Sequence, residues 1–247
     1  MQQYFVKGLA SSPVTIEDKE ISKHMFQVMR LKEDDEVTLV FDDGIKRLAR
    51  VVNVEAHQLE LIEELVDNVE LPVQVSIASG FPKGDKLEFI TQKVTELGAS
   101  QIWAFPADWS VAKWDGKKLG KKVEKLEKIA LGAAEQSKRN LVPSITLFEK
   151  KADFLAQLEQ FDRIVVAYEE SAKEGEAAAL LQSLTGLEAG SKLLFIFGPE
   201  GGLSPAEIES FTVKGAILAG LGPRILRAET APLYALSAVS VVTELMN

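Results

Sequence analysis

From Pro72 onward, short continuous apolar runs alternate with segments whose apolar residues recur at helical spacing. Strands are predicted at Val73–Ala78, Gln101–Phe105 and Leu193–Phe197, and only the last is apolar at every position, so both of its faces are expected to be buried. A helix is expected at Ala177–Leu184. Strands that alternate with helices are typical of a parallel sheet covered on both faces. This part of the chain is therefore predicted to form a doubly wound α/β sheet of about five or six strands.

Residues 1–71 show a different pattern, of short β segments with one helix. Val37–Phe41 and Lys46–Val54 flank a short loop that contains Gly44, which predicts a hairpin, and the alternating run Gln58–Ile62 predicts a further strand. Apolar residues at helical spacing before Leu31 predict a helix packed on this sheet, and they are Ile21, Met25, Val28 and Met29. We expect a small β-rich domain over residues 1–71 and an α/β domain over residues 72–247.

Two glycine-rich loops follow two of the predicted strands. Gly198–Gly202 comes directly after the central apolar run, and Gly220–Pro223 follows a predicted strand at Ala216–Leu218. Ser204 and Glu207 have the spacing of a capping box, which predicts a helix start beside the first loop. Ligands of open α/β sheets bind outside the carboxyl ends of the strands, so we expect these strands to be neighbours and their loops to form one site. Neither loop has the P-loop or GxGxxG spacing, which disfavours a phosphate cradle.

The end of the chain predicts an unusually apolar helix. Thr230 is expected to cap a helix over Ala231–Leu245, whose residues are apolar or small nearly all round. A helix with so little polar surface must be buried by its own domain, by a second subunit, or by both.

The charge of the chain is unevenly distributed. The net charge is −9, yet residues 71–150 carry a balance of +4. A predicted helix that begins near Lys117 has an apolar inner stripe from Leu119 to Ala133, which directs most lysines outwards together. With Trp109 and Trp114 nearby, this face suits attraction of nucleic-acid phosphates and stacking of bases, although a solubilising lysine face is the alternative interpretation.

Several function classes are disfavoured by composition. The chain has no cysteine and only two histidines, His24 and His57, without metal-ligand spacing, so we expect no disulfide and no metal site. Neither a signal-peptide core nor an apolar run long enough for a bilayer occurs. We expect a cytoplasmic protein that does not span a membrane.

Three motifs carry a resemblance to a known family. GPEGGLSPAEI at Gly198–Ile208 and LGPRILRAETA at Leu221–Ala231 are similar to the two cofactor-loop motifs of the ribosomal RNA small subunit methyltransferase E family, within the SPOUT superfamily. EQSKRN at Glu135–Asn140 resembles the family's Glu-Gln-Ser-x-Arg-Asn motif. Ser22–Leu31 resembles a segment of the PUA-like barrel at the front of the family, although Asp34-Asp35 stands where a Gly-Asp pair usually follows.

The resemblance implies an activity and a set of site residues. It implies a C-terminal α/β domain with a trefoil knot, in which residues 227–247 thread through an earlier loop, and a homodimer that methylates uridine N3 of 16S rRNA with S-adenosylmethionine. The implied cofactor-binding residues are Phe197, Gly198, Pro199, Glu200, Gly201, Gly202, Leu218, Leu221, Gly222, Ile225, Leu226, Thr230 and Ala231. Candidate RNA-binding residues are Arg30, Lys117, Lys121, Lys122, Arg139 and Asn140.

Arg227 and Glu229 are the candidates for catalysis, because removal of the uracil N3 proton needs a base or donors that stabilise the uracil anion. The alternative is that these two residues form only an ion pair that braces the loop. A SPOUT ribose 2′-O-methyltransferase and a non-catalytic ribosome assembly factor are the competing interpretations of function.

Overall fold

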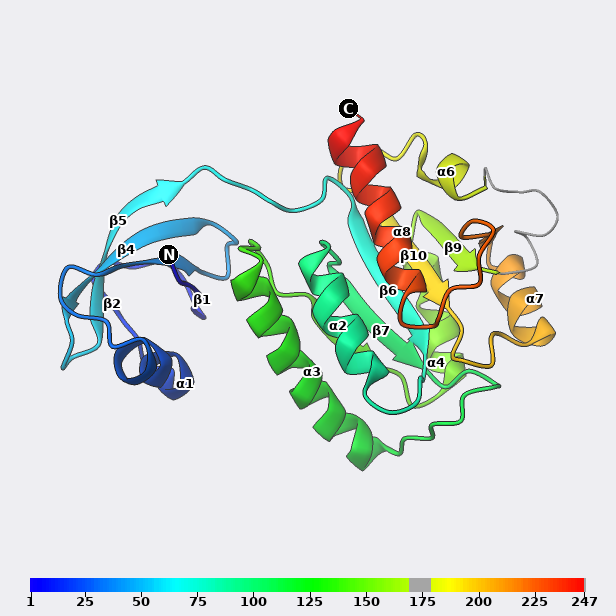
Figure 1. Ribbon diagram of the computed structural model, residues 1–247, viewed down its shortest axis with the longest axis horizontal. Coiled ribbons are helices and arrows are strands. Elements are labelled where there is room, and N and C mark those ends of the chain that lie inside the picture. Colours follow the sequence, from blue (N-terminus) through cyan, green and yellow to red (C-terminus); the bar gives the residue numbers. More distant parts are fainter. Residues whose placement is uncertain (169–178, 247) are drawn as a thin grey trace. The chain divides into compact units, whose positions relative to one another are not determined.

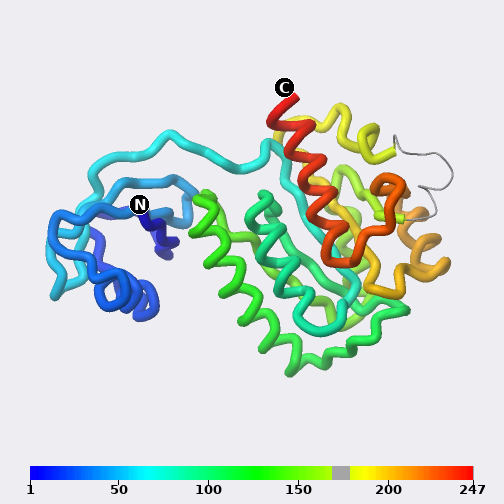
Figure 2. The backbone as a smooth tube through the Cα atoms, viewed as in Figure 1, coloured from blue at the N-terminus to red at the C-terminus, as the bar shows by residue number. Residues whose placement is uncertain are grey.

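The computed structural model describes residues 1–168 and 179–246 (Figures 1 and 2). The chain divides into two compact units. Unit 1 contains Met1–Glu70 together with Ala134–Leu141, and unit 2 contains Leu71–Ala133 and Val142–Asn247. The segment 134–141 thus belongs to unit 1 although it lies within the sequence of the α/β part.

Unit 2 is built on a six-stranded, wholly parallel sheet of order β11-β9-β10-β6-β7-β8. Its strands are β6 (Gln74–Gly80), β7 (Gln101–Phe105), β8 (Ser144–Leu147), β9 (Arg163–Ala167), β10 (Lys192–Phe197) and β11 (Ile217–Ala219). Its helices are α2 (Lys86–Glu96), α3 (Gly116–Gln136, whose last residues belong to unit 1), α4 (Lys151–Ala156), α6 (Ala179–Leu184), α7 (Pro205–Val213) and α8 (Ala231–Ser240), with a 3₁₀ turn at Leu158–Gln160. The predicted α/β sheet is confirmed, and residues 177 and 178 of one expected helix lie outside the described ranges.

Strand β10 occupies the middle of the sheet and is buried on both faces. Leu193, Phe195 and Phe197 pack with side chains of α2 and α8, whereas Leu194 and Ile196 pack with side chains of α4 and α7. Figure 1 shows these two helix layers on opposite faces of the sheet. The continuous apolar run therefore has the physical cause inferred from the sequence, since neither face of the strand meets water.

One expectation about this sheet is wrong. The strands that precede the two glycine loops, β10 and β11, are not neighbours, because β9 pairs with both of them. Pairing order depends on long-range packing that hydrophobic periodicity does not encode. The loops still leave the same edge of the sheet, since all the strands are parallel.

The final helix also differs from its prediction. It continues beyond α8 as a π-helical segment, η3 (Val241–Leu245), and Thr230 makes no side-chain cap hydrogen bond. Leu236 and Val239 are buried in the unit's own core, but Tyr234, Val241 and Leu245 are exposed. Only one face of this apolar helix is therefore covered within the chain.

Unit 1 contains a five-stranded sheet of order β1-β3-β4-β5-β2. Its strands are β1 (Gln3–Phe5), β2 (Val14–Thr15), β3 (Glu36–Val40), β4 (Lys46–Asn53) and β5 (Gln58–Leu65). The predicted hairpin is confirmed by the antiparallel pairing of β3 with β4, and Gly44 in its loop has the positive φ of 72° that favours glycine. The sheet has the half-barrel character expected of a PUA-like module.

The helical segment of unit 1 consists of α1 (Lys19–Ser22) followed by the π-helix η1 (Lys23–Val28). Met25 is buried as predicted, but Val28 and Met29 are exposed. A π-helix has i→i+5 hydrogen bonds, as between the Met29 N–H and the His24 carbonyl. Apolar residues at the spacing of an α-helix therefore no longer lie on one face of this segment.

Among the described helices, none combines the length and the apolar character needed to cross a membrane.

The pKa values of a buried tyrosine and a half-buried glutamate in unit 1 are raised. The Tyr4 hydroxyl lies 3.0 Å from Nδ1 of His24, and burial, with a contribution from the charge of Glu135, raises the pKa of Tyr4 to about 12. Burial also raises the pKa of Glu135 to about 6, against the opposing effects of the Phe5 backbone N–H and of Lys138. Glu135 therefore binds a proton in the folded state at pH values where an unfolded glutamate is already ionised.

This burial predicts a change of stability with pH. Between the unfolded pKa of 4.5 and the folded pKa of about 6, the folded state holds more protons, so stability falls as pH rises through this window and then levels off. Glu135→Gln should abolish this loss, which is about 1 kcal/mol because solvent screens a half-buried carboxyl group, and it should be more stable than the wild type at pH 7. Urea unfolding at several pH values tests this, with the exposed Glu127→Gln as control. Parallel stability profiles for wild type and Glu135→Gln would contradict it.

Candidate functional site

A pocket of about 680 Å³ opens within unit 2 at the carboxyl edge of the sheet. Segments that follow β7, β9, β10 and β11 contribute to it, together with the first residue of α2 and of α8. The lining residues are Lys86, Trp109, Ala167, Tyr168, Phe197, Gly198, Pro199, Glu200, Gly201, Gly202, Leu203, Pro205, Leu221, Gly222, Arg224, Ile225, Leu226, Arg227, Ala228 and Ala231. Its size is that of a typical small-molecule site.

Glycine is required by the tight fold of the first loop. A Cβ atom on Gly198 would lie 2.7 Å from the carbonyl carbon of Gly202, closer than such atoms approach. The Gly202 N–H donates to the Pro199 carbonyl at 2.8 Å, and Gly202 has a φ of +80°. The loop therefore presents mainly backbone to the pocket.

A buried carboxylate fixes this loop to its surroundings. Glu207 is 1% exposed, and it forms the predicted capping box: its Oε2 accepts from the Ser204 N–H at 2.9 Å, and Ser204 Oγ accepts from the Glu207 N–H at 3.2 Å. Its Oε1 accepts from the Asp108 N–H at 2.9 Å and lies 3.3 Å from the Lys151 ammonium. The start of α7 is thereby joined to the loop that follows β7.

Asp108 completes the same network. Its carboxylate accepts from Ser204 Oγ at 2.6 Å and forms an ion pair with Lys151. Hydrogen bonds from Lys151 and then from Ser204 lower the pKa of Asp108. The residue next in sequence, Trp109, is thus held beside the glycine loop.

Lys86 joins two acidic residues of the site. Its ammonium lies 2.9 Å from Glu200 Oε1 in the first glycine loop and 3.2 Å from Glu229 Oε2 before α8. Hydrogen bonding to Glu200, followed by that to Glu229, raises the pKa of Lys86 although burial opposes it. For Glu200, burial alone would raise the pKa, but hydrogen bonds from Lys86 and from the Lys83 N–H lower it overall.

The two catalytic candidates lie in different environments. Arg227 lines the pocket with its side chain 82% exposed, and its Nη1 is 4.0 Å from Glu229 Oε1. Glu229 is mostly buried, does not line the pocket, and makes its shorter ion pair with Lys86. The Arg227–Glu229 ion pair of the alternative interpretation is therefore present but long, and Glu229 lies closer to Lys86 than to Arg227.

The predicted cofactor residues converge, with two exceptions. All of them line the pocket except Leu218, which packs in the core, and Thr230. The sequence analysis missed Lys86, Trp109, Tyr168 and Arg224 as lining residues. Trp109, Tyr168 and Arg224 follow β7, β9 and β11, which end at the same edge of the sheet. Ligands bind outside the carboxyl ends of parallel strands, so applying this rule to every strand could have found these three residues.

The candidate RNA-binding residues occupy three kinds of position. The inner stripe of α3 is buried as predicted, and Lys117 and Lys121 are exposed on its outer face. Lys122 is half-buried, with its ammonium 4.4 Å from the centre of the Trp114 ring. Arg30 is exposed in unit 1.

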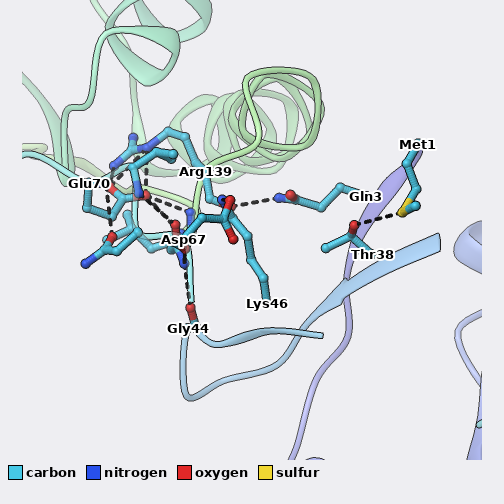
Figure 3. A network of polar contacts seen from close by, with 12 residues as sticks. Met1, Gln3, Thr38, Gly44, Lys46, Asp67, Glu70 and Arg139 are labelled. Carbon is cyan, nitrogen blue, oxygen red and sulfur yellow. Dashed lines mark hydrogen bonds and ion pairs between the residues drawn. The ribbon is translucent and has the colours of Figure 1, made fainter. Parts of the chain in front are cut away.

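Arg139 and Asn140 are not placed as expected, and Figure 3 shows Arg139 beside Glu70. Arg139 is 2% exposed and forms a bidentate ion pair with Glu70. Asn140 Nδ2 donates to the carbonyls of Gly44 at 3.0 Å and Asp67 at 3.2 Å. These side chains bind the end of the β-rich segment within unit 1, so their position does not support the predicted contact with RNA or with a target base.

In the part of the chain that the structure describes, no three histidine, cysteine, aspartate or glutamate side chains gather in a way that could hold a metal ion.

Comparisons with known proteins agree with one another. A family model described as an RNA methyltransferase domain matches residues 69–240, and one described as an RNA methyltransferase PUA domain matches residues 16–64. The ribosomal RNA small subunit methyltransferase E of Bacillus subtilis (strain 168) is 46% identical over 253 residues, covering 100% of this chain and 99% of the relative. The protein of the same name from Mycobacterium tuberculosis is 29% identical over 93% of this chain and 87% of its own.

Solved structures are similar over the full length. The ribosomal RNA small subunit methyltransferase E of Neisseria gonorrhoeae, bound to S-adenosyl methionine, is 25% identical with a TM-score of 0.81 over 98% of both chains. A crystal structure described as that of a hypothetical protein is 43% identical, with a TM-score of 0.91 over 100% of both chains.

The buried network predicts a strong effect of one substitution. Glu207→Ala leaves the Ser204 and Asp108 N–H groups and the Lys151 ammonium without their acceptor, so we expect it to destabilise unit 2 by about 2 to 4 kcal/mol. Glu209→Ala, an exposed glutamate of the same helix, should change stability by less than about 0.5 kcal/mol. Denaturant unfolding compares the two, and equal effects would show that the network does not stabilise the site.

Proposed function

The chain belongs to the ribosomal RNA small subunit methyltransferase E family, and from this premise we propose that it methylates N3 of a uridine in 16S rRNA with S-adenosylmethionine as methyl donor. The observation that carries the proposal is the convergence of both glycine loops on one pocket of about 680 Å³. The family's two cofactor-loop motifs, at Gly198–Ile208 and Leu221–Ala231, form most of its wall.

The residues of the pocket fit this cofactor. Gly198 leaves no room for a Cβ, and a Cβ on Gly201 would lie 3.1 Å from that of Trp109, so the loop surface is largely backbone. We propose that this backbone and the apolar side chains of Leu221, Ile225 and Leu226 hold the adenosine portion. When bound, the cofactor supplies a methyl group on a positively charged sulfur, which is already a good leaving group.

The protein's part in the reaction is mainly to position the base and to manage one proton. The N3–methyl bond forms as the sulfur–methyl bond breaks, and N3 must lose its hydrogen as a proton. Arg227, exposed within the pocket, can donate to the uracil carbonyl oxygens and stabilise the negative charge that develops there. Glu229, oriented by Lys86, is the candidate acceptor of the proton, and because it does not line the pocket it would receive the proton through an intervening water.

RNA recognition in this proposal relies on a local cationic face. The chain carries −9 overall, but residues 71–150 carry +4, and Lys117 and Lys121 lie exposed on α3. Such lysines attract phosphates over a range that salt shortens. We propose that this face and Arg30 contact the RNA, and that the enzyme acts in the cytoplasm.

We also propose that the enzyme is a homodimer. Four large apolar side chains of α8, η3 and the residue after them are exposed: Tyr234, Val241, Leu245 and Met246. A contiguous apolar surface of this kind favours association, and a second copy of the chain is the occupant that the family implies. Threading of residues 227–247 through an earlier loop stays a prediction.

The activity is tested with small ribosomal subunits from a strain that lacks this gene. Incubation with the enzyme and S-adenosylmethionine should produce 3-methyluridine in 16S rRNA, detected by mass spectrometry of nucleosides. A 2′-O-methylated nucleoside instead, or no methylation at all, would contradict the proposed function.

Arg227→Ala should lower kcat by about 10²- to 10³-fold while leaving cofactor affinity within about threefold, because its donors act on charge that develops in the transition state. Lys214→Ala, which removes a cation paired with Glu159 at 2.6 Å, serves as control and should retain activity. Full turnover by Arg227→Ala would exclude Arg227 from catalysis.

The dimer is tested by placing a charge on the apolar face. Leu245→Glu, at a side chain that is 75% exposed, should yield a monomer in light scattering at micromolar concentration because the interface would have to bury a carboxylate. Val213→Glu on α7, equally accessible but outside this face, should leave the mass unchanged. A wild-type monomer would refute the dimer.

A further inference from the structure

Trp109 is an aromatic side chain of the pocket that the proposed mechanism leaves without a role. It belongs to the loop after β7, lines the pocket, and is 49% exposed. The other tryptophans are packed: Trp103 is buried among Phe148, Phe154 and Phe161, and Trp114 contacts Phe81 and Lys122. In the described ranges no aromatic ring or cation stacks on Trp109, so much of its indole surface faces solvent within a ligand-sized cavity.

The indole rests on the glycine loop. A Cβ on Gly202 would lie 4.0 Å from Cε3 and Cζ3 of the indole, and a Cβ on Gly201 would lie 3.1 Å from the Trp109 Cβ. Because these positions are glycines, the ring lies close to bare backbone on this side. Its exposed part is then available to a flat molecule that enters the pocket.

The loop that carries Trp109 is held in place by the contacts of its neighbour in the absence of a ligand. Asp108, the preceding residue, is bound through its N–H to Glu207 and through its carboxylate to Ser204 and Lys151. Because these contacts hold the backbone next to Trp109, less of the loop has to be ordered when a ligand stacks on the indole.

The charges around the indole favour nucleic acid as its partner. Arg224 and Arg227 are exposed and line the same pocket, and Lys86 lies in its wall. Exposed arginines suit the phosphates that flank a nucleotide. An RNA base inserted for chemistry must leave its stack, and aromatic side chains commonly take over that stacking.

We propose that Trp109 is the surface on which the target base stacks once it has swung out of the RNA. The inference rests on the proposed function and extends it, because it assigns a residue for binding the acceptor rather than the methyl donor. Stacking is expected to act on the productive complex with RNA and to leave the donor site intact.

Two substitutions of Trp109 distinguish stacking on a base from simple apolar packing in the pocket. Trp109→Leu keeps an apolar side chain without a π face, and it should lower kcat/KM for small-subunit rRNA by about 5- to 150-fold, the range of one base–aromatic stack. Trp109→Phe keeps a π face and should stay within about threefold of the wild type. Both variants should bind S-adenosylmethionine within about twofold of the wild type by calorimetry, and Phe89→Leu, at an exposed aromatic side chain outside the pocket, is the matched control.

Any result other than these contradicts the proposed role of Trp109. Full kcat/KM in Trp109→Leu would show that no base stacks there, and an equal loss of S-adenosylmethionine affinity would assign the indole to the donor's adenine. A Trp109→Phe variant as defective as Trp109→Leu would point to an indole-specific structural role. Failure of the proposed function would be recognised separately, because the wild type itself would then methylate no ribosomal RNA.

Discussion

The carboxylate of Glu207 determines how the parts of the pocket are held together. Three backbone or side-chain donors from three segments converge on it: the N–H of Ser204, the N–H of Asp108 and the ammonium of Lys151. A buried charge is tolerated only where it is paired and hydrogen-bonded, and here every partner comes from a segment next to the site. The same group that caps α7 therefore also fixes the loop of Trp109 against the glycine loop.

A second set of charges joins other parts of the pocket wall. Lys86 begins α2 and contacts one acidic residue from each of the two loop regions, Glu200 and Glu229. These regions follow β10 and β11, which are separated in the sheet by β9, so backbone pairing alone does not bring them together. The ion pairs of Lys86 join them, and the end of β9 contributes Ala167 and Tyr168 between them.

Local signals predicted much of this arrangement. The apolar run of β10, the capping box of Ser204 and Glu207 and the lysine face of α3 all depend on residues within a few positions of each other. The position of β9 depends on packing between distant segments, and the exposure of Val28 depends on a π-helical turn. The burial of Arg139 was not predicted because its partner, Glu70, lies 69 positions earlier in the sequence and pairs with it inside unit 1.

The proposed function depends on which molecule the pocket at the carboxyl edge of unit 2 binds. The most direct test is a crystal structure of the protein grown with S-adenosylmethionine. We expect the adenine ring to lie between the loops at 198–202 and 221–226, with the methyl group facing the side of Lys86 and Arg227. Ordered cofactor at any other place, with these two loops enclosing only solvent, would contradict the account.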